Sequence, residues 1–452
     1  MVSDRGVAAG RLAAANAALA AGDLDEAVTE ARRLAESGGP GERQQALTIL
    51  DSVIDASEHH CAALMARGRL RAETGDRIGA IKDAASAVTA APRDAEANTL
   101  LSEQMAAVGR LDEAAMFSYE ALKAEPGEVG RYVHLAVMLR RQKSFDAAEE
   151  LLRTAASLAP HDPDPVTMHM DSLVQLRRMP EAITIGRAAR QRFPNDARLL
   201  RKLGILLQLA GHDAEALAVL QDLQRIAPAD GFAKHMLEAA AGTTPAKADP
   251  EYVRQVFEVL APRYDDLMLE TRGYRAPALL AQAVKAHTAG RDLRVLELGC
   301  GTGLCGLMVR DMAVTLKGID LSPDMADLAL ASRIYDSVDV ADAVAAMAGD
   351  PETYDVVLAG DTLAYFGDLA PLLHQVKARL KPGGVFAFSV EATSDGTSCR
   401  LTPSGTFAHS RNELERLAGA DGFKVLQMAP ESLKLLNGEP VHGVIAVLQS
   451  AA

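Results

Sequence analysis

Small apolar side chains recur along the first half of the chain at a spacing of 34 residues. A unit of this length holds two helices and two turns. Alanine lets helices cross closely without losing helix propensity, and proline ends the second helix. The pattern therefore predicts a solenoid of helix pairs as a first domain over residues 1–245. Its columns are Ala80, Ala114, Ala148, Ala182 and Ala216; Ala87, Ala121, Ala155, Ala189 and Leu223; and Pro92, Pro126, Pro160, Pro194 and Pro228.

The turns between the paired helices carry a second signal. Gly75, Gly109 and Gly211 stand where the first helix of a pair should end, and glycine readily adopts the left-handed conformation of a helix terminus. Lys143 and Arg177 replace glycine in two other units. The array resembles the tetratricopeptide repeat (TPR), with five full units between residues 61 and 230. The resemblance implies an extended surface that binds a protein or peptide partner.

The second half of the chain has a different pattern of apolar positions. After a loop-like segment around residues 242–250, short apolar runs alternate with helical patterns. Such alternation predicts a parallel sheet covered by helices, as a second domain over residues 246–452. The runs expected to form strands are 294–298, 315–320, 355–360, 385–390, 423–429 and 441–448.

Candidate chemistry lies at the ends of the first two strands. One strand runs into Gly299-Cys300-Gly301-Thr302-Gly303, and the next ends at Asp320. Ligands of such sheets bind beyond the carboxyl ends of the strands, where glycine lets the backbone approach them and an acid can accept hydrogen bonds from ribose hydroxyls. An adenosine-containing cofactor is therefore indicated.

The sequence of this loop is compatible with two classes of cofactor. Residues 301–306 also spell G-x-G-x-x-G, the dinucleotide pattern, which would indicate a nicotinamide oxidoreductase. Against that reading, Glu297 precedes the first glycine, and a carboxylate there would repel a pyrophosphate. A cofactor with an amino-acid part suits this register better.

The segment Val295-Leu296-Glu297-Leu298-Gly299-Cys300-Gly301-Thr302-Gly303 resembles the first motif of class I S-adenosylmethionine-dependent methyltransferases. The resemblance continues through residues 318–322, 354–358 and 380–384, and the whole chain resembles predicted bacterial methyltransferases that carry an N-terminal TPR array. It implies a Rossmann-like domain with a seven-stranded sheet whose last strand is antiparallel. It also implies S-adenosylmethionine as the cofactor and methyl transfer to a small molecule or a protein docked by the repeats.

The resemblance also assigns roles to individual residues. Asp320 would hold the ribose hydroxyls and Asp342 the adenine amino group, although a helix N-cap is the alternative for Asp342. Residues 252–275 are expected to form a lid. The candidate catalytic residues are Tyr365 and His409, the latter as a base or, alternatively, as an ordinary residue at a helix start. The full cofactor-binding set is Tyr264, Tyr274, Glu297, Gly299, Gly301, Gly303, Asp320, Leu321, Asp342 and Asp361.

The charge and composition of the chain disfavour several classes of ligand and partner. The net charge is −14, and both halves carry more acidic than basic residues, which disfavours nucleic acid as a partner. No C-x-x-C pair occurs, and His59-His60-Cys61 lacks a second ligand cluster, so no metal site is expected. Without a signal-peptide core or a long apolar stretch, we expect no membrane contact and a cytoplasmic location. A second functional hypothesis is an adaptor whose methyltransferase-like domain binds cofactor without catalysis.

Overall fold

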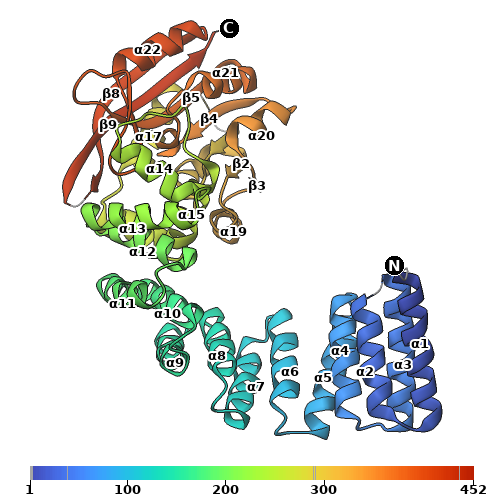
Figure 1. Ribbon diagram of the computed structural model, residues 1–452. Helices are drawn as coiled ribbons and strands as arrows, with labels where there is room; N and C mark the ends of the chain where they lie inside the picture. The colour runs from blue at the N-terminus through green and yellow to red at the C-terminus, as the bar shows by residue number, and fades with distance from the viewer. Residues whose placement is uncertain (1–3, 38, 289, 291, 437, 452) are drawn as a thin grey trace. The chain divides into compact units, whose positions relative to one another are not determined.

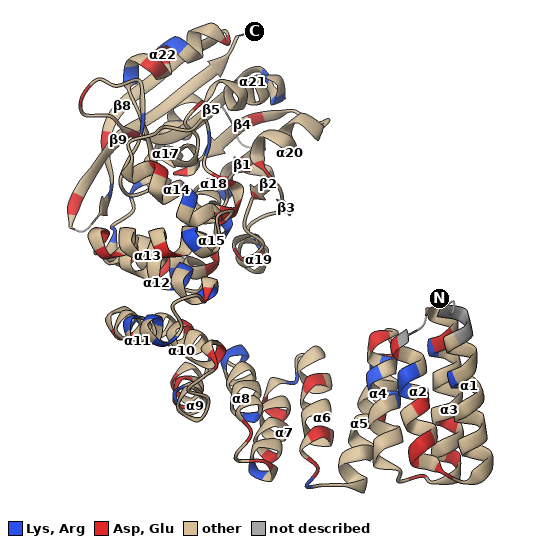
Figure 2. Ribbon diagram, in the orientation of Figure 1, with Lys and Arg blue, Asp and Glu red and all other residues tan. Residues whose placement is uncertain are grey.

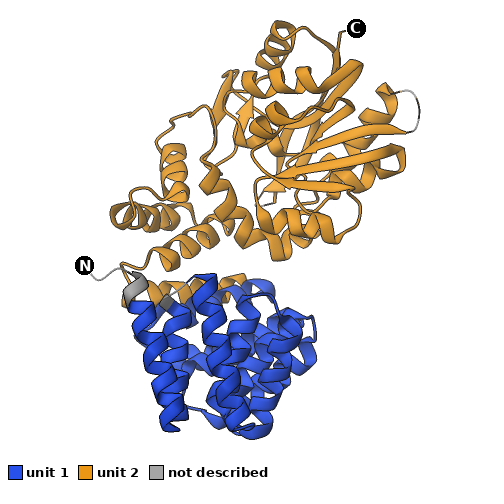
Figure 3. Ribbon diagram, turned by 90° about the vertical axis from the view of Figure 1, so that its right-hand side faces the viewer, with its two compact units in different colours: residues 1–178 blue, residues 179–452 orange. Residues whose placement is uncertain are grey.

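The protein is described here by a computed structural model that covers residues 4–37, 39–288, 290, 292–436 and 438–451. It forms two compact units, residues 1–178 and 179–452 (Figure 3). The all-helical part continues to α14, which ends at Ala240, so the change of fold class comes later than the boundary between the units. The domain boundary expected at residue 245 remains a prediction.

The first unit is a run of antiparallel helix pairs, with acidic and basic positions interspersed along the helices (Figures 1 and 2). Its helices are α1 Asp4–Ala21, α2 Leu24–Ser37, α3 Pro40–Ala56, α4 Cys61–Glu73, α5 Arg77–Ala90, α6 Ala95–Ala107, α7 Leu111–Ala124, α8 Val129–Arg141, α9 Phe145–Leu158 and α10 Pro163–Gln175. The second unit opens with four more, α11 Met179–Arg192, α12 Ala197–Leu209, α13 Asp213–Ile226 and α14 Gly231–Ala240. This solenoid-like run confirms the helical prediction.

The periodic residues lie where the pattern placed them. Every alanine of the two columns is at most 3% exposed, and Leu223 is fully buried. Each column proline comes two residues after the last residue of a second helix, as Pro92 does after α5. Small side chains at the crossings therefore let neighbouring helices pack closely.

The inter-helix turns require a left-handed residue whether or not glycine is present. Gly75, Gly109 and Gly211 have φ of 90°, 78° and 75°. Lys143 and Arg177 take the same turn with φ of 63° each. A side chain with a Cβ is strained in this conformation, by roughly 1–2 kcal/mol.

The α/β part is built on a mixed sheet. One path runs β3-β2-β1-β4-β5-β9-β8, with β9 antiparallel to both of its neighbours and the first five strands parallel. This agrees with the expected seven strands and antiparallel last strand. The main strands are β1 Leu293–Leu298, β2 Ala313–Asp320, β3 Ser337–Val340, β4 Tyr354–Ala359, β5 Leu380–Ala392, β8 Phe423–Leu436 and β9 Glu439–Ser450. Two short strands that the sequence did not predict, β6 Cys399–Leu401 and β7 Phe407–His409, add to the end of β5.

Helices cover both faces of this sheet because the strand residues alternate in direction. Val356 and Leu358 of β4 pack with α17 Ala276–His287, α18 Leu304–Val309 and α19 Pro323–Ala331. Val357 packs on the opposite face, with α20 Ala343–Gly349, α21 Ala370–Arg379 and α22 Arg411–Ala420. Before the sheet, α15 Pro250–Leu260 is followed by the short turns 261–263, 264–266 and 267–271. The carboxyl ends of β1, β2 and β4 are thus held in one row.

We predict that Lys143→Gly stabilises the protein by about 0.5–1 kcal/mol, because glycine takes the left-handed turn without a Cβ penalty. The matched reverse change, Gly109→Lys at the equivalent turn, should destabilise by a similar amount. Melting temperatures of the two variants and the wild type check this. Shifts of the same sign would contradict the assignment of strain to this turn.

Candidate active site

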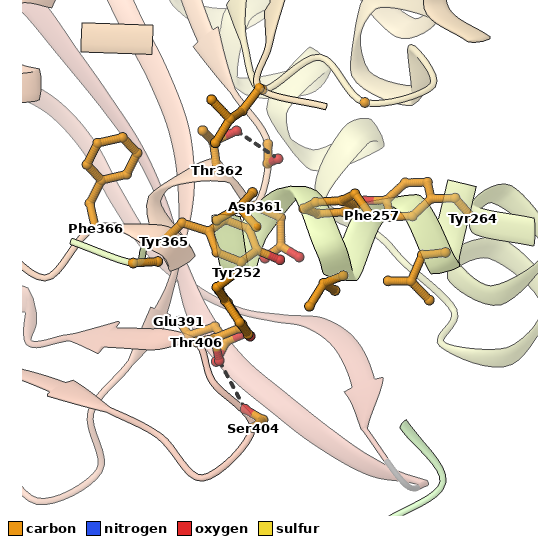
Figure 4. Close-up of a pocket in the computed structure, with 18 of the residues that line it drawn as sticks. Tyr252, Phe257, Tyr264, Asp361, Thr362, Tyr365, Phe366, Glu391, Ser404 and Thr406 are labelled. Carbon is orange, nitrogen blue, oxygen red and sulfur yellow. Dashed lines mark hydrogen bonds between the residues drawn. The ribbon is translucent and has the colours of Figure 1, made fainter. Parts of the chain in front are cut away.

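A cavity of about 450 Å³ opens at the carboxyl ends of β1, β2 and β4 (Figure 4). Its wall comes from the glycine loop, the segment after β4, helix α15 and the turns behind it, the loop 402–406, the end of β8, and helices α12 and α13. This volume lies in the usual range for sites that bind small ligands. The lining residues used below are Gln208, Leu209, Asp213, Lys247, Tyr252, Phe257, Tyr264, Arg272, Gly299, Gly301, Asp320, Leu321, Asp342, Asp361, Thr362, Tyr365, Glu391, Ser404, Thr406 and Lys434.

The glycine loop leaves room that a side chain would fill. Gly299 and Gly301 have φ of 62° and 55°, a left-handed backbone that favours glycine. A Cβ on Gly299 would lie 2.4 Å from Oγ1 of Thr362, which itself donates to the carbonyl of Leu298. The loop is therefore specific for glycine at its first position, and its backbone faces the cavity. Gly303 (φ 101°) begins α18 and lies outside the cavity lining.

Asp320, at the end of β2, both shapes the loop and lines the cavity. Its Oδ2 accepts a hydrogen bond from N–H of Gly301 at 2.7 Å, and its Oδ1 accepts one from N–H of Ser322 at 2.9 Å. Burial nevertheless raises the pKa of Asp320 above its usual range. An ionised carboxylate has about four acceptor positions, so the group retains capacity for ligand hydroxyls. Leu321 lines the cavity beside it.

Asp342 serves as a helix cap and also lines the cavity. Its Oδ1 accepts from N–H of Val344 and Ala345, at the start of α20. Its Oδ2 accepts from the ammonium of Lys247, which also lies 4.8 Å from the ring centre of Phe366. Burial acts to raise the pKa of Asp342, but these hydrogen bonds outweigh it and lower the pKa. The sequence analysis did not anticipate Lys247.

The tyrosines named as candidate site residues lie partly in the cavity and partly in the core. Tyr264 lines the cavity, and its ring lies 3.9 Å from where a Cβ of Gly301 would be. Tyr365 also lines the cavity, and its role toward a substrate stays a prediction. Tyr274 instead packs in the core beneath the sheet and is outside the lining.

Glu297 does not line the cavity either. It is 1% exposed, and Oε2 accepts a hydrogen bond from the hydroxyl of Tyr335 at 2.8 Å. Burial raises the pKa of Glu297 to about 8. The resemblance implies that Glu297 reaches the amino end of the cofactor, directly or through water; this stays a prediction, and here the carboxylate is hydrogen-bonded to Tyr335 and lies outside the cavity lining.

His409 lies on β7, away from the cavity lining. It is 1% exposed, and Nε2 is hydrogen-bonded to the backbone carbonyl of Phe366 at 2.8 Å. Burial lowers the pKa of His409 below its usual range. The ring thus joins β7 to the segment around Phe366, and the described geometry gives no path by which it would act as a base on a ligand.

A buried ion cluster in the cavity was not found from the sequence. Lys434 of β8 is 6% exposed, and its Nζ lies 2.5 Å from Oδ2 of Asp361 and 3.1 Å from Oε1 of Glu391. Burial acts to lower the pKa of Lys434, but the two carboxylates outweigh it and raise the pKa. The strand predicted over residues 423–429 in fact continues to Leu436 as β8. The signal in the sequence for a buried cation was the lysine within the apolar run Leu433-Lys434-Leu435-Leu436.

We predict that Glu297→Gln flattens the pH dependence of stability. The folded protein holds a proton on Glu297 that the unfolded chain releases between about pH 4.5 and 8, so wild-type stability falls as the pH rises through this window. The variant should match the wild type near pH 5 and exceed it by about 1 kcal/mol or more near pH 8. Melting temperatures across this range measure the difference. Glu439→Gln, at an exposed position, is the control, and parallel wild-type and Glu297→Gln curves would refute the prediction.

Comparison with known proteins supports the interpretation of the C-terminal part. Residues 252–428 match the family model described as "Methyltransferase domain". A demethylmenaquinone methyltransferase of Chlorobaculum tepidum is 32% identical over 29% of this chain and 56% of its own length. A ubiquinone biosynthesis O-methyltransferase of Burkholderia multivorans is 35% identical over 31% of this chain and 63% of its own length. The chain thus spans less than two thirds of these curated relatives.

Among solved structures, the TPR protein YrrB, described as having an unusual peptide-binding site, covers 42% of this chain and 97% of its own with 17% identity and a TM-score of 0.35. Within the described residues, no helix is both long and apolar enough to cross a membrane. A protein of Mycolicibacterium smegmatis named as a probable S-adenosylmethionine-dependent methyltransferase is 31% identical over 34% of this chain and 61% of its own length, which supports S-adenosylmethionine as the cofactor. The C-terminal part of this chain thus matches a methyltransferase domain, and its named relatives are methyltransferases.

Proposed function

We propose that the protein transfers a methyl group from S-adenosylmethionine to an acceptor bound in the same cavity. One observation carries the proposal: the cavity joins a glycine cradle and Asp320 on one side to an aromatic and charged wall on the other. Gly299, Gly301, Asp320 and Leu321 are proposed to hold the cofactor, with Tyr264 covering the loop. When bound, the cofactor supplies a methyl group made reactive by the positive sulfur.

The residues of the chain act mainly by positioning and by excluding water. Tyr252, Phe257, Tyr264 and Tyr365 enclose the cavity with rings whose neighbouring centroids lie 5.7–6.5 Å apart. A closed, aligned site can supply much of the rate enhancement of a displacement reaction, because the entropy lost in orienting the reactants is lost on binding and not in the reaction step. Asp342 and Asp361 are proposed as further contacts to the cofactor. Tyr365 is proposed to contact the acceptor.

We also propose that the helical array is a tetratricopeptide-type array that recognises a protein or peptide partner. Its support is the repeat pattern together with exposed apolar side chains on α7, where Met116 and Tyr119 are 50% and 54% exposed. These two residues are three positions apart and therefore share one face of the helix. The acceptor itself is proposed as either a small molecule or a group on such a partner.

Calorimetric titration of the full chain with S-adenosylmethionine and with S-adenosylhomocysteine tests the cofactor site. The wild type should bind both, and Gly301→Arg should weaken binding by at least roughly tenfold, because the new side chain fills the cradle. Gly349→Arg is the matched control, since nothing lies within 4 Å of a Cβ at that exposed position. Absence of heat with both ligands in the wild type would overturn the proposal, as would unchanged binding by Gly301→Arg.

A further inference from the structure

Asp361, which lines the cavity, carries an unpartnered buried oxygen. Oδ1 of Asp361 is inaccessible to solvent and has no hydrogen-bond partner among the described residues, while Oδ2 is held by Lys434. Asp361 is itself in a left-handed conformation, with φ of 61°. A strained residue with an unused acceptor in a cavity is typical of a ligand-binding position.

The side chains around Asp361 hold its carboxylate in place. Glu391 accepts from Lys434 through Oε1 and from the hydroxyl of Thr406 through Oε2. Figure 4 shows Asp361, Glu391, Tyr252 and Tyr365 gathered on one side of the cavity. The described ionisable groups that line the whole cavity sum to two negative charges, from the five carboxylates Asp213, Asp320, Asp342, Asp361 and Glu391 and the three cations Lys247, Arg272 and Lys434. A net negative wall with aromatic rings favours a cationic group, through hydrogen bonds and cation–π attraction.

The same lining argues against an alcohol or phenol as the acceptor. No histidine occurs among the described residues that line the cavity, and a carboxylate is a poor base toward a hydroxyl at neutral pH. A neutral amine attacks through its own lone pair, and an amine that enters as an ammonium first passes one proton through the Asp361 carboxylate to water. Positive charge then develops on the nitrogen, next to Asp361.

We infer that the acceptor of this protein is an amine whose nitrogen is bound by Oδ1 of Asp361, with Lys434 and Glu391 holding that carboxylate in place. The inference rests on the proposed function. The nitrogen lone pair forms the bond to the methyl carbon, while the carbon–sulfur bond breaks with its electron pair left on sulfur. The nitrogen then releases its proton to the Asp361 carboxylate, from which it passes to water.

The test uses two cofactor analogues that differ at the reacting position. Sinefungin carries an ammonium-bearing carbon where the methylated sulfur would be, and S-adenosylhomocysteine carries neither charge nor a hydrogen-bond donor there. Calorimetry on the full chain should show sinefungin binding roughly tenfold more tightly, as expected for one hydrogen bond between charged groups. Asp361→Asn should abolish the preference, and the readout is the ratio of the two affinities, since Asp361 is itself among the proposed cofactor contacts. Asparagine tolerates the left-handed backbone, and Glu391 stays paired with Lys434 at 3.1 Å, so the ammonium keeps one ionic partner in the variant.

Asp355→Asn is the matched control. Asp355 is paired with Lys381 at 2.8 Å, lies near the start of β4, whereas Asp361 follows the end of that strand, and is outside the cavity lining. This variant should keep the wild-type preference for sinefungin. Equal affinities for the two analogues in the wild type, or an undiminished preference in Asp361→Asn, would overturn the inference while leaving the cofactor site intact. Failure to bind either analogue in the wild type would instead overturn the proposed function.

Discussion

The contact between Lys434 and the carboxylates of Asp361 and Glu391 holds the centre of the cavity together. It joins the segment after β4, the end of β5 and the long strand β8 at a point where all three groups are largely buried. Removing one member of a buried ion cluster leaves an uncompensated charge and typically costs about 3–5 kcal/mol. The geometry of the reacting end of the cavity therefore depends on this cluster more than on any single loop.

A chain of hydrogen bonds extends from this cluster to the helical repeats. Thr406 donates to Glu391 and is hydrogen-bonded to Ser404, whose carbonyl accepts from the side chain of Gln208 on α12 at 2.7 Å. In the same loop, the carbonyl of Gly405 is hydrogen-bonded to His235 of α14. Helices that the sequence assigns to a separate repeat domain thus form part of the cavity wall. Within residues 179–452, the last repeats and the sheet make one site.

The sequence predicted those features that a local pattern encodes. The repeat columns, the left-handed turns, the glycine loop and Asp320 all follow from residue type at fixed spacing, and the structure places Gly299, Gly301, Asp320, Leu321, Asp342, Asp361, Tyr264 and Tyr365 around one cavity. Features that depend on long-range packing were not predictable. Tyr335 covers Glu297 from 38 residues away, and Lys434 reaches Asp361 across 73 residues. For His409, a glycine and a helix start nearby gave no sign that its ring is buried against Phe366.

The central claim is that one cavity, walled by both the repeats and the sheet, receives the cofactor and the acceptor together. A crystal structure of the full chain with S-adenosylhomocysteine tests it most directly. The account predicts the nucleoside beside Asp320 and Leu321, with open space between the sulfur and Asp361. Ligand bound outside this cavity, or a cavity left empty at saturating ligand, would contradict it.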